Sequence, residues 1–141
     1  MNRNSYGCRT PDIRDYGSEP LIVNIDCFTK QNPYYRTALW TGKHLQVTLM
    51  SIPVHGDIGL EIHSDVDQFI RIEDGCALVM MGKNKTLLNY QQRVNSNYAV
   101  IIPAGTWHNI INIGNTPLKL YSIYAPPQHP FGTVHETKEA A

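Results

Sequence analysis

The chain has 141 residues, 42% of them hydrophobic, and its 12 basic and 12 acidic residues give a formal charge of zero. This length suits a single domain with a core of its own. The even mixture of charges argues against a nucleic-acid or membrane surface, and no apolar run approaches the roughly 20 residues that a membrane helix needs.

The cysteines favour a reduced compartment. Cys8, Cys27 and Cys76 are odd in number and lack CxxC spacing, which indicates neither a disulfide framework nor a zinc ribbon. The first residues also lack the apolar core of a signal peptide. We therefore expect a cytoplasmic protein.

The two ends of the chain differ from its middle. Residues 1–20 are polar and contain prolines and glycines, so we expect a flexible N-terminal arm. The stretch LIVNIDCF (21–28) is predicted to be a short strand, and we expect a single barrel domain over 21–125. The last stretch, 126–141, holds too much proline and glycine for a central strand and is expected to form a C-terminal loop and tail.

Short β-rich segments separated by turn signals fill the middle of the chain. No window of helical length shows a sustained 3.6-residue period. Many short strands at close spacing are typical of an all-β antiparallel sandwich or barrel. The predicted strands after residue 28 are ALWT, KHLQVTLMSI, IGLEIH, QFIRI, CALVMM, TLLNYQQRV, YAVIIP, HNIINIG and LKLYSIYA.

Two of these segments carry residues that suit metal binding. In EIHSDVDQ, Glu61 and His63 are two positions apart, so both side chains point to one face of a strand. Gln68 follows after a short turn. In PAGTWHNIIN, a tight turn containing proline and glycine precedes His108, which begins the next predicted strand, and Asn112 follows four positions later.

These segments resemble the two motifs of the cupin superfamily. The second motif, Pro-x-Gly, two residues, His, three residues and Asn, is matched from Pro103 to Asn112. The first, His-x-His followed by Glu and Gly, is matched in spacing but carries Glu61 for the first His and Gln68 for the Glu. Asn97 stands where the second motif begins with Gly, and Asn tolerates the left-handed conformation that such a turn needs.

The resemblance covers about residues 45–125 and implies a jelly-roll, or cupin, barrel with metal ligands at one mouth. Within the superfamily, the chain is similar to small single-domain bacterial cupins, some of which are labelled as resembling mannose-6-phosphate isomerase. The stretches RTALWTGKHLQVTLMSI and YAPPQHPFGTVHETK also resemble that group.

The ligands implied by the resemblance are Glu61, His63, Gln68 and His108. Two imidazoles, one carboxylate and one amide carry the same charge as the usual three imidazoles and one carboxylate. Mixed nitrogen and oxygen donors suit one divalent ion of Zn, Fe, Mn, Ni or Co. Asp67 competes with Gln68 as the fourth ligand, and solvated strand residues are the alternative interpretation of Glu61 and Gln68.

Strand parity supplies candidate pocket residues. Asn112 shares the face of His108, and Tyr124 shares an inward face with Ser122 on the last long strand. Gln46 lies on one face of KHLQVTLMSI, although the alternate face with Leu45, Val47 and Leu49 suits the interior equally well. His129 and His135 either fold over the mouth or remain solvated. No cluster of Lys or Arg is evident there, which weakens the case for a sugar phosphate. The pocket candidates are Gln46, Asn112, Tyr124 and His129.

Two function classes follow. The favoured one is a metal-dependent enzyme on a small oxygenated substrate, of the isomerase, lyase or dioxygenase type, and the alternative is a non-catalytic module that binds or senses a small ligand. We expect a small-molecule ligand, no nucleic-acid or membrane partner, and a homodimer. In that dimer, the predicted strand at 21–28 would pair across a two-fold axis and cover a sheet edge.

Overall fold

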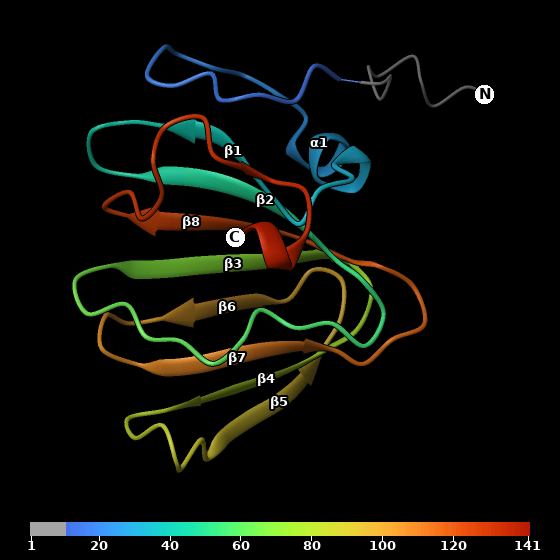
Figure 1. Cartoon of the computed structure of the whole chain (residues 1–141), viewed down its shortest axis with the longest axis vertical. Helices are drawn as coiled ribbons and strands as arrows, with labels where there is room; N and C mark the ends of the chain where they lie inside the picture. Colours follow the sequence, from blue (N-terminus) through green and yellow to red (C-terminus); the bar gives the residue numbers. More distant parts are fainter. Residues whose placement is uncertain (1–10) are drawn as a thin grey trace.

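A computed structural model describes residues 11–141 and shows two antiparallel sheets (Figure 1). The larger sheet has six strands in the order β6-β3-β8-β2-β1-β9, and the smaller has three in the order β5-β4-β7. This confirms the expected all-β jelly-roll architecture. The strands are β1 (Arg36–Thr41), β2 (Gln46–Ile52), β3 (Asp67–Asp74), β4 (Ala77–Gly82), β5 (Tyr90–Val94), β6 (Ala99–Ile102), β7 (Trp107–Asn112), β8 (Leu118–Ala125) and β9 (Val134–His135).

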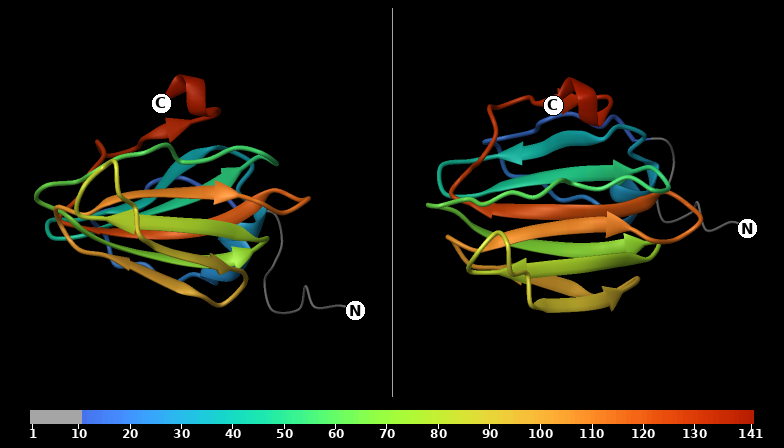
Figure 2. Two further views of the ribbon diagram at one scale, coloured as in Figure 1. Left: turned by 90° about the horizontal axis from the view of Figure 1, so that it is seen from below. Right: turned by 60° about the horizontal axis from the view of Figure 1, so that its bottom comes forward.

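The main core lies between the two sheets, which curve around it (Figure 2). Alternation along the strands builds this core: in β4, Ala77, Val79 and Met81 are buried, and the residues between them are half-buried. The strands β2, β3 and β8 contribute in the same way, because every second side chain points inward. The inward residues of these three strands include Met50, Ile52, Ile70, Ile72, Leu118 and Leu120.

The predicted strand IGLEIH pairs with β7 but is not a regular strand. The backbone N–H of Glu61 donates to the carbonyl of His108 at 3.0 Å, and the N–H of His108 donates back to Glu61 at 2.9 Å. An isolated bridge also joins Asp57 to Ile111. The segment thus extends the smaller sheet by isolated bridges, which is enough to hold Glu61 beside His108.

The predicted strand at 21–28 is wrong, because a short helix, α1 (Ile25–Gln31), replaces its second half. Asn24 caps the helix by accepting a hydrogen bond from the N–H of Cys27 at 3.1 Å. Asp26 and Lys30 form an i,i+4 ion pair at 3.2 Å. These local signals, together with packing of the helix on the large sheet, outweigh the β-propensity of the Leu-Ile-Val-Asn-Ile sequence.

Helix α1 covers the outer face of the large sheet. Its residues Ile25 and Phe28, three positions apart, pack against a second apolar cluster built on Leu39, Leu49 and Tyr121. The segment therefore cannot supply a regular strand to a partner in the way expected from the sequence. The homodimer stays a prediction without support from this segment.

Asp15 fastens both ends of the described chain to β1. Its carboxylate accepts hydrogen bonds from the N–H groups of Gly17 and Gly132, each at 2.9 Å, and from the N–H and hydroxyl of Thr41 at 3.0 and 2.6 Å. The N–H of Tyr16 also donates to the carbonyl of Leu39 at 2.9 Å. Residues 11–20 are thus tied to the barrel, and the rest of the expected arm, 1–10, lies outside the described residues.

The C-terminal segment passes along the outer edge of β1 (Figure 2). It forms the short strand β9, which pairs with Arg36 and Thr37, and ends in a 3₁₀ helix, η2 (Lys138–Ala140). Proline and glycine keep most of this segment irregular. No helix among residues 11–141 is long and apolar enough to cross a membrane.

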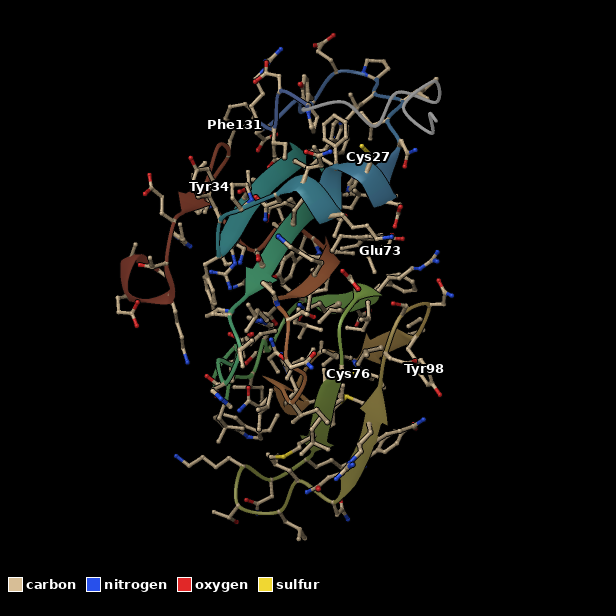
Figure 3. All side chains as sticks on the ribbon, turned by 90° about the vertical axis from the view of Figure 1, so that its right-hand side faces the viewer. Cys27, Tyr34, Glu73, Cys76, Tyr98 and Phe131 are labelled. Atoms are coloured by element: carbon tan, nitrogen blue, oxygen red, sulfur yellow. The ribbon has the colours of Figure 1, made fainter. Side chains whose placement is uncertain are left out.

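The cysteines differ from the expectation. Cys27 is buried and disulfide-bonded, which differs from the reduced cysteines expected from the sequence. Cys76 is a free, exposed thiol after the turn between β3 and β4, far from Cys27 (Figure 3). Cys8 lies outside the described residues.

Candidate metal centre

Three predicted ligands converge at the mouth of the barrel. The Oε2 atom of Glu61 lies 3.4 Å from the Nε2 atoms of both His63 and His108. One ligand atom from each of the three residues lies within 4.8 Å of the other two. The side chain of His108 is 1% exposed and that of His63 is 10% exposed, whereas Glu61 is 30% exposed. Glu61 therefore marks the side from which solvent reaches the site.

The backbone between the two motifs holds these side chains in place. Gly105 has a φ of 82°, a left-handed value that glycine adopts without strain. Its N–H donates to the carbonyl of His63 at 2.8 Å, and the N–H of Thr106 closes the turn on the carbonyl of Pro103 at 3.2 Å. The tight turn predicted from the Pro-x-Gly sequence thus ties His63 to the start of β7, the strand that carries His108.

A backbone contact sets the tautomer of His108. Its Nδ1 lies 2.9 Å from the carbonyl oxygen of Thr106, which can only accept, so Nδ1 carries the hydrogen and donates it. The Nε2 atom then presents its lone pair to the site. Metal-binding histidines are oriented by such a second hydrogen bond.

Glu61 is ionised at neutral pH. Burial raises the pKa of its carboxyl group, but hydrogen bonding from His108 and His63 lowers it to about 2; this applies while Nε2 of each ring carries a hydrogen, which a bound cation would replace. The site therefore offers one negative charge and two imidazole nitrogens, the donor combination that suits a divalent cation of the first transition row.

Gln68 turns its amide into the barrel, whereas Asp67 points away from it. Gln68 is 3% exposed, and its Nε2 donates to the Ser122 hydroxyl at 2.8 Å. Asp67 is exposed, and its Oδ1 accepts from the N–H of Ala104 at 2.8 Å. Gln68 also pairs with Tyr124 across β3 and β8. The contacts of the two side chains favour Gln68 as the fourth donor.

Unpaired polar atoms gather at this place. Among residues 11–141, six buried side-chain nitrogen or oxygen atoms lack a hydrogen-bond partner, and three of them are Nε2 of His63, Nε2 of His108 and Oε1 of Gln68. Buried polar atoms rarely go without a partner. Since these atoms belong to three of the four predicted ligands, the residues present fit a bound divalent cation.

Tyr124 and His129 lie beside the site. The ring centroid of Tyr124 is 5.9 Å from that of His63, and its hydroxyl is 3.4 Å from Nε2 of His129. Burial raises the pKa of Tyr124, so its hydroxyl keeps the proton. Burial and, after it, the Arg36 cation lower the pKa of His129 to about 4, so this imidazole is neutral.

Gln46 is buried, but its amide is fully used by the protein. Its Nε2 donates to the Thr41 hydroxyl and to the His129 carbonyl, both at 2.9 Å. Its Oε1 accepts from the N–H groups of Gln128 and His129 at 3.1 and 2.9 Å. Gln46 therefore holds the loop that carries His129, and it differs from the expected pocket residue because no amide atom is left for a ligand.

Asn112 is also inward but has a structural role. Its Nδ2 donates to the carbonyls of Ile52 and Thr116, both at 3.0 Å, and its Oδ1 accepts from the N–H of Gly114 at 2.9 Å. These bonds fasten the turn after β7. Asn112 therefore also differs from the expected pocket residue.

Arg36 is the residue that the sequence analysis missed. It is 6% exposed, and its Nη1 lies 3.1 Å from Nδ1 of His135. Arg36 and Ala38 alternate with Thr37 and Leu39 in β1, and Leu39 belongs to the outer cluster, so Arg36 faces inward. The only signal in the sequence was this parity, which becomes informative once the outer face of β1 is known.

Comparisons with known proteins agree with the fold and the motifs. A model of the cupin domain matches residues 48–124. The chain is 64% identical over 139 residues to the uncharacterised protein YrkC of Bacillus subtilis (strain 168), covering 99% of this chain and 75% of that protein. It is 47% identical over 118 residues to the uncharacterised protein L612 of Acanthamoeba polyphaga mimivirus, covering 83% and 72% of the two chains.

A solved structure gives the same picture. The crystal structure of BH2720 from Bacillus halodurans is 62% identical and superposes with a TM-score of 0.90, covering 91% of this chain and 97% of that one.

Proposed function

The chain belongs to the cupin family, and we propose that it is a metal-dependent enzyme acting on a small oxygenated substrate by isomerase, lyase or dioxygenase chemistry. The observation that carries this proposal is the group of buried, unpartnered donor atoms on His63, His108 and Gln68 beside the Glu61 carboxylate. None of the relatives described above is named as a mannose-6-phosphate isomerase, so we do not propose that activity for this chain.

Glu61, His63, Gln68 and His108 would hold one ion of Zn, Fe, Mn, Ni or Co. Such an ion supplies Lewis-acid polarisation of a carbonyl or enediol oxygen. The chain itself contributes orientation. The Thr106 carbonyl directs Nε2 of His108 into the site, and the Ser122 hydroxyl holds the amide of Gln68.

Tyr124 and His129 can handle a proton beside the ligands. The Tyr124 hydroxyl keeps its proton because burial raises its pKa, and neutral His129 with its hydrogen on Nε2 can donate to the Tyr124 oxygen, which leaves the hydroxyl hydrogen of Tyr124 for a substrate. We propose Tyr124 as the hydrogen-bond donor to a substrate oxygen and His129 as the group that orients it. Tyr124→Phe should then reduce turnover while leaving the metal content unchanged.

A non-catalytic binding module is the second candidate, and one observation favours it. Among the described residues the only carboxylate at the centre is Glu61, which lies 3.4 Å from Nε2 of both histidines as a predicted metal ligand, and a carboxylate that binds a metal is a poor general base. A site with few proton acceptors is suited to holding a ligand without turning it over.

Metal loading followed by substrate screening distinguishes these functions. The purified protein is loaded separately with Zn, Fe(II), Mn, Ni or Co, analysed for bound metal, and assayed on sugars, keto acids and catechol-like compounds. Turnover that a chelator abolishes supports the enzyme, and tight ligand binding without turnover supports the module. A wild-type chain that takes up none of the five metals would refute both.

A further inference from the structure

The inner face of β5 is only partly covered by the large sheet. Tyr90 stands opposite the core residue Met81 in the β4–β5 pair, so its side chain lies on the inner side of the small sheet. Gln92 and Val94 follow at two-residue intervals and share this face. Val94 is 7% exposed, whereas Gln92 is exposed and Tyr90 is 62% exposed. The large sheet ends at β6, which leaves the start of β5 without a strand opposite it.

A groove runs along this uncovered face, between β5 and the edge of β6. It consists of two adjoining cavities of about 210 and 530 Å³, which share Met81, Tyr90 and Ile101. Four of the eleven large hydrophobic side chains that are exposed among residues 11–141 line it, namely Leu87, Tyr90, Tyr98 and Ile101. Tyr98 lies in the turn between the two strands (Figure 3). Exposed hydrophobic residues are ordinary when scattered, but a set gathered in one groove marks a binding surface.

The strand β6 also presents unpaired backbone groups at this groove. At one end of the β3–β6 ladder, the N–H of Ile72 donates to the carbonyl of Tyr98 at 3.0 Å. Every second residue of an antiparallel edge strand turns its backbone groups toward the neighbouring strand, so those of Ala99 and Ile101 point away from β3. In the part of the chain that the structure describes, no other strand pairs with this edge. Such an edge can accept an added strand.

The charge around the groove has one sign. Residues 75–135 contain no Asp or Glu, and Lys83 lines the wider of the two cavities. A second copy that paired through its own β6 would bring no carboxylate from this region and would add like charges, which oppose association. Residues 1–10 contain two arginines and no acidic residue, so this segment is no better matched in charge. Charge complementarity therefore favours an acidic partner from another protein.

From these features we infer that the groove binds an extended segment of another protein, which adds a strand to the free edge of β6. The backbone of this segment bonds to Ala99 and Ile101, its apolar side chains cover Tyr90, and an acidic side chain pairs with Lys83. A fatty carboxylate would suit the cavities and the lysine but would leave the strand edge unused, so the edge favours a peptide. The inference is independent of the metal centre and of the proposed function.

Peptide selection on the full-length protein provides the test. A phage library of short random peptides is selected on the immobilised wild type, and the most enriched peptide is synthesised with a fluorescent label as the probe. We expect Val, Ile or Thr at alternating positions and at least one Asp or Glu, because an added strand presents every second side chain to the groove. Fluorescence anisotropy then measures the affinity of the probe for the wild type and for the variants.

Two substitutions separate the strand edge from the charge. Ile101→Pro removes an N–H that points away from β3, so β6 keeps its pairing while the edge is blocked, and the affinity should fall at least about tenfold. Lys83→Glu should lower the affinity about fivefold by charge reversal. Lys85→Glu is the matched control, because Lys85 lies 5.8 Å from the ring centroid of Trp107 and does not line either cavity. This variant should bind the probe as the wild type does.

A further variant covers the case in which Ile101→Pro does not fold. Tyr90→Ser changes an exposed side chain, so the melting temperature should stay unchanged while the affinity for the probe falls about tenfold. The inference is overturned if no peptide is enriched, or if the probe binds these variants as tightly as the wild type. A wild-type dimer that Tyr90→Ser converts to a monomer would assign the groove to a second copy. Binding to phosphatidylglycerol vesicles that Lys83→Glu removes, without peptide binding, would assign it to a membrane surface.

Discussion

His108 and Asn112 lie on the same face of the same strand, four positions apart, and both are buried, yet they differ in what they contact. Asn112 uses its amide in three hydrogen bonds to the protein. His108 uses one ring nitrogen and leaves the other unpaired beside Glu61. At the Asn112 end of β7, both amide atoms have hydrogen-bond partners in the protein. At the His108 end, one ring nitrogen has none.

The difference shows that burial alone does not identify a binding residue in a barrel. Both ends of β7 place a polar side chain in the interior, but only an unpaired atom leaves room for a ligand. Buried polar groups with hydrogen-bond partners stabilise the fold, whereas buried polar groups without partners can bind a ligand. Substitutions at four residues, with control variants, test this distinction, in order of decreasing expected effect.

His108→Ala should abolish metal binding, with affinity falling at least about a hundredfold, because it removes a short directional bond that water replaces poorly. Elemental analysis of the metal-loaded protein measures the loss. His44→Ala, at an exposed histidine before β2, is the control and should keep full occupancy. Full metal content in His108→Ala would remove the distinction between the two ends of β7.

Asn112→Ala should instead destabilise the fold, by about 2 kcal/mol, because it leaves the carbonyls of Ile52 and Thr116 and the N–H of Gly114 without partners. Urea unfolding of the metal-free protein provides the measurement. The folded fraction should still bind metal with the stoichiometry of the wild type. A variant with normal stability but reduced metal content would place Asn112 in the site after all.

Gln68→Ala should weaken metal binding about tenfold, and Asp67→Ala should leave it unchanged, because Gln68 is turned inward and Asp67 is bound to Ala104 at the surface. Metal titration of both variants provides the comparison. Gln68→Glu should retain the metal, since it restores the common cupin donor. Loss of metal in Asp67→Ala with retention in Gln68→Ala would mean that the fourth ligand is Asp67.

His129 should make the free energy of unfolding modestly dependent on pH. Its pKa in the folded protein is lowered from 6.5 to about 4, so the unfolded chain takes up a proton more readily. The stabilisation from neutral His129 is therefore complete above pH 6.5 and is lost as the pH falls toward 4. The loss should amount to about 1 kcal/mol once partial exposure is allowed for. His129→Gln should remove this part of the slope in unfolding measurements at pH 4 to 7, and an unchanged slope would contradict the assignment.

Local patterns predicted the barrel well. Eight strands between residues 36 and 125 follow predicted segments, and the turn at Pro103–Gly105 lies where the motif places it. Asn97, which replaces a motif glycine, has a φ of 75°, as expected for a left-handed turn residue. These features depend on residues close together in the sequence, so alternation and turn chemistry suffice to find them.

Features that depend on distant segments were missed or mistaken. The helix α1 formed where β-propensity favoured a strand, because the cap at Asn24 and the outer face of the large sheet decide the conformation there. Arg36 faces the interior through pairing of β1 with β2 and β9, which no short stretch of sequence reveals. The full use of the Gln46 amide likewise depends on a loop more than 80 residues away.

The hydrogen bond from Gly132 to Asp15 has a consequence for the order of events during synthesis. Gly132 is synthesised 117 residues after Asp15, so the hydrogen bond between them can form only after most of the chain has been made. The segment from His129 to His135 is made at the same late stage, so its bonds to Gln46 and its pairing with β1 also form late. The bonds from Gly17 and Thr41 to Asp15 span at most 26 residues and can form much earlier, so the two ends of the described chain join β1 at different times during synthesis.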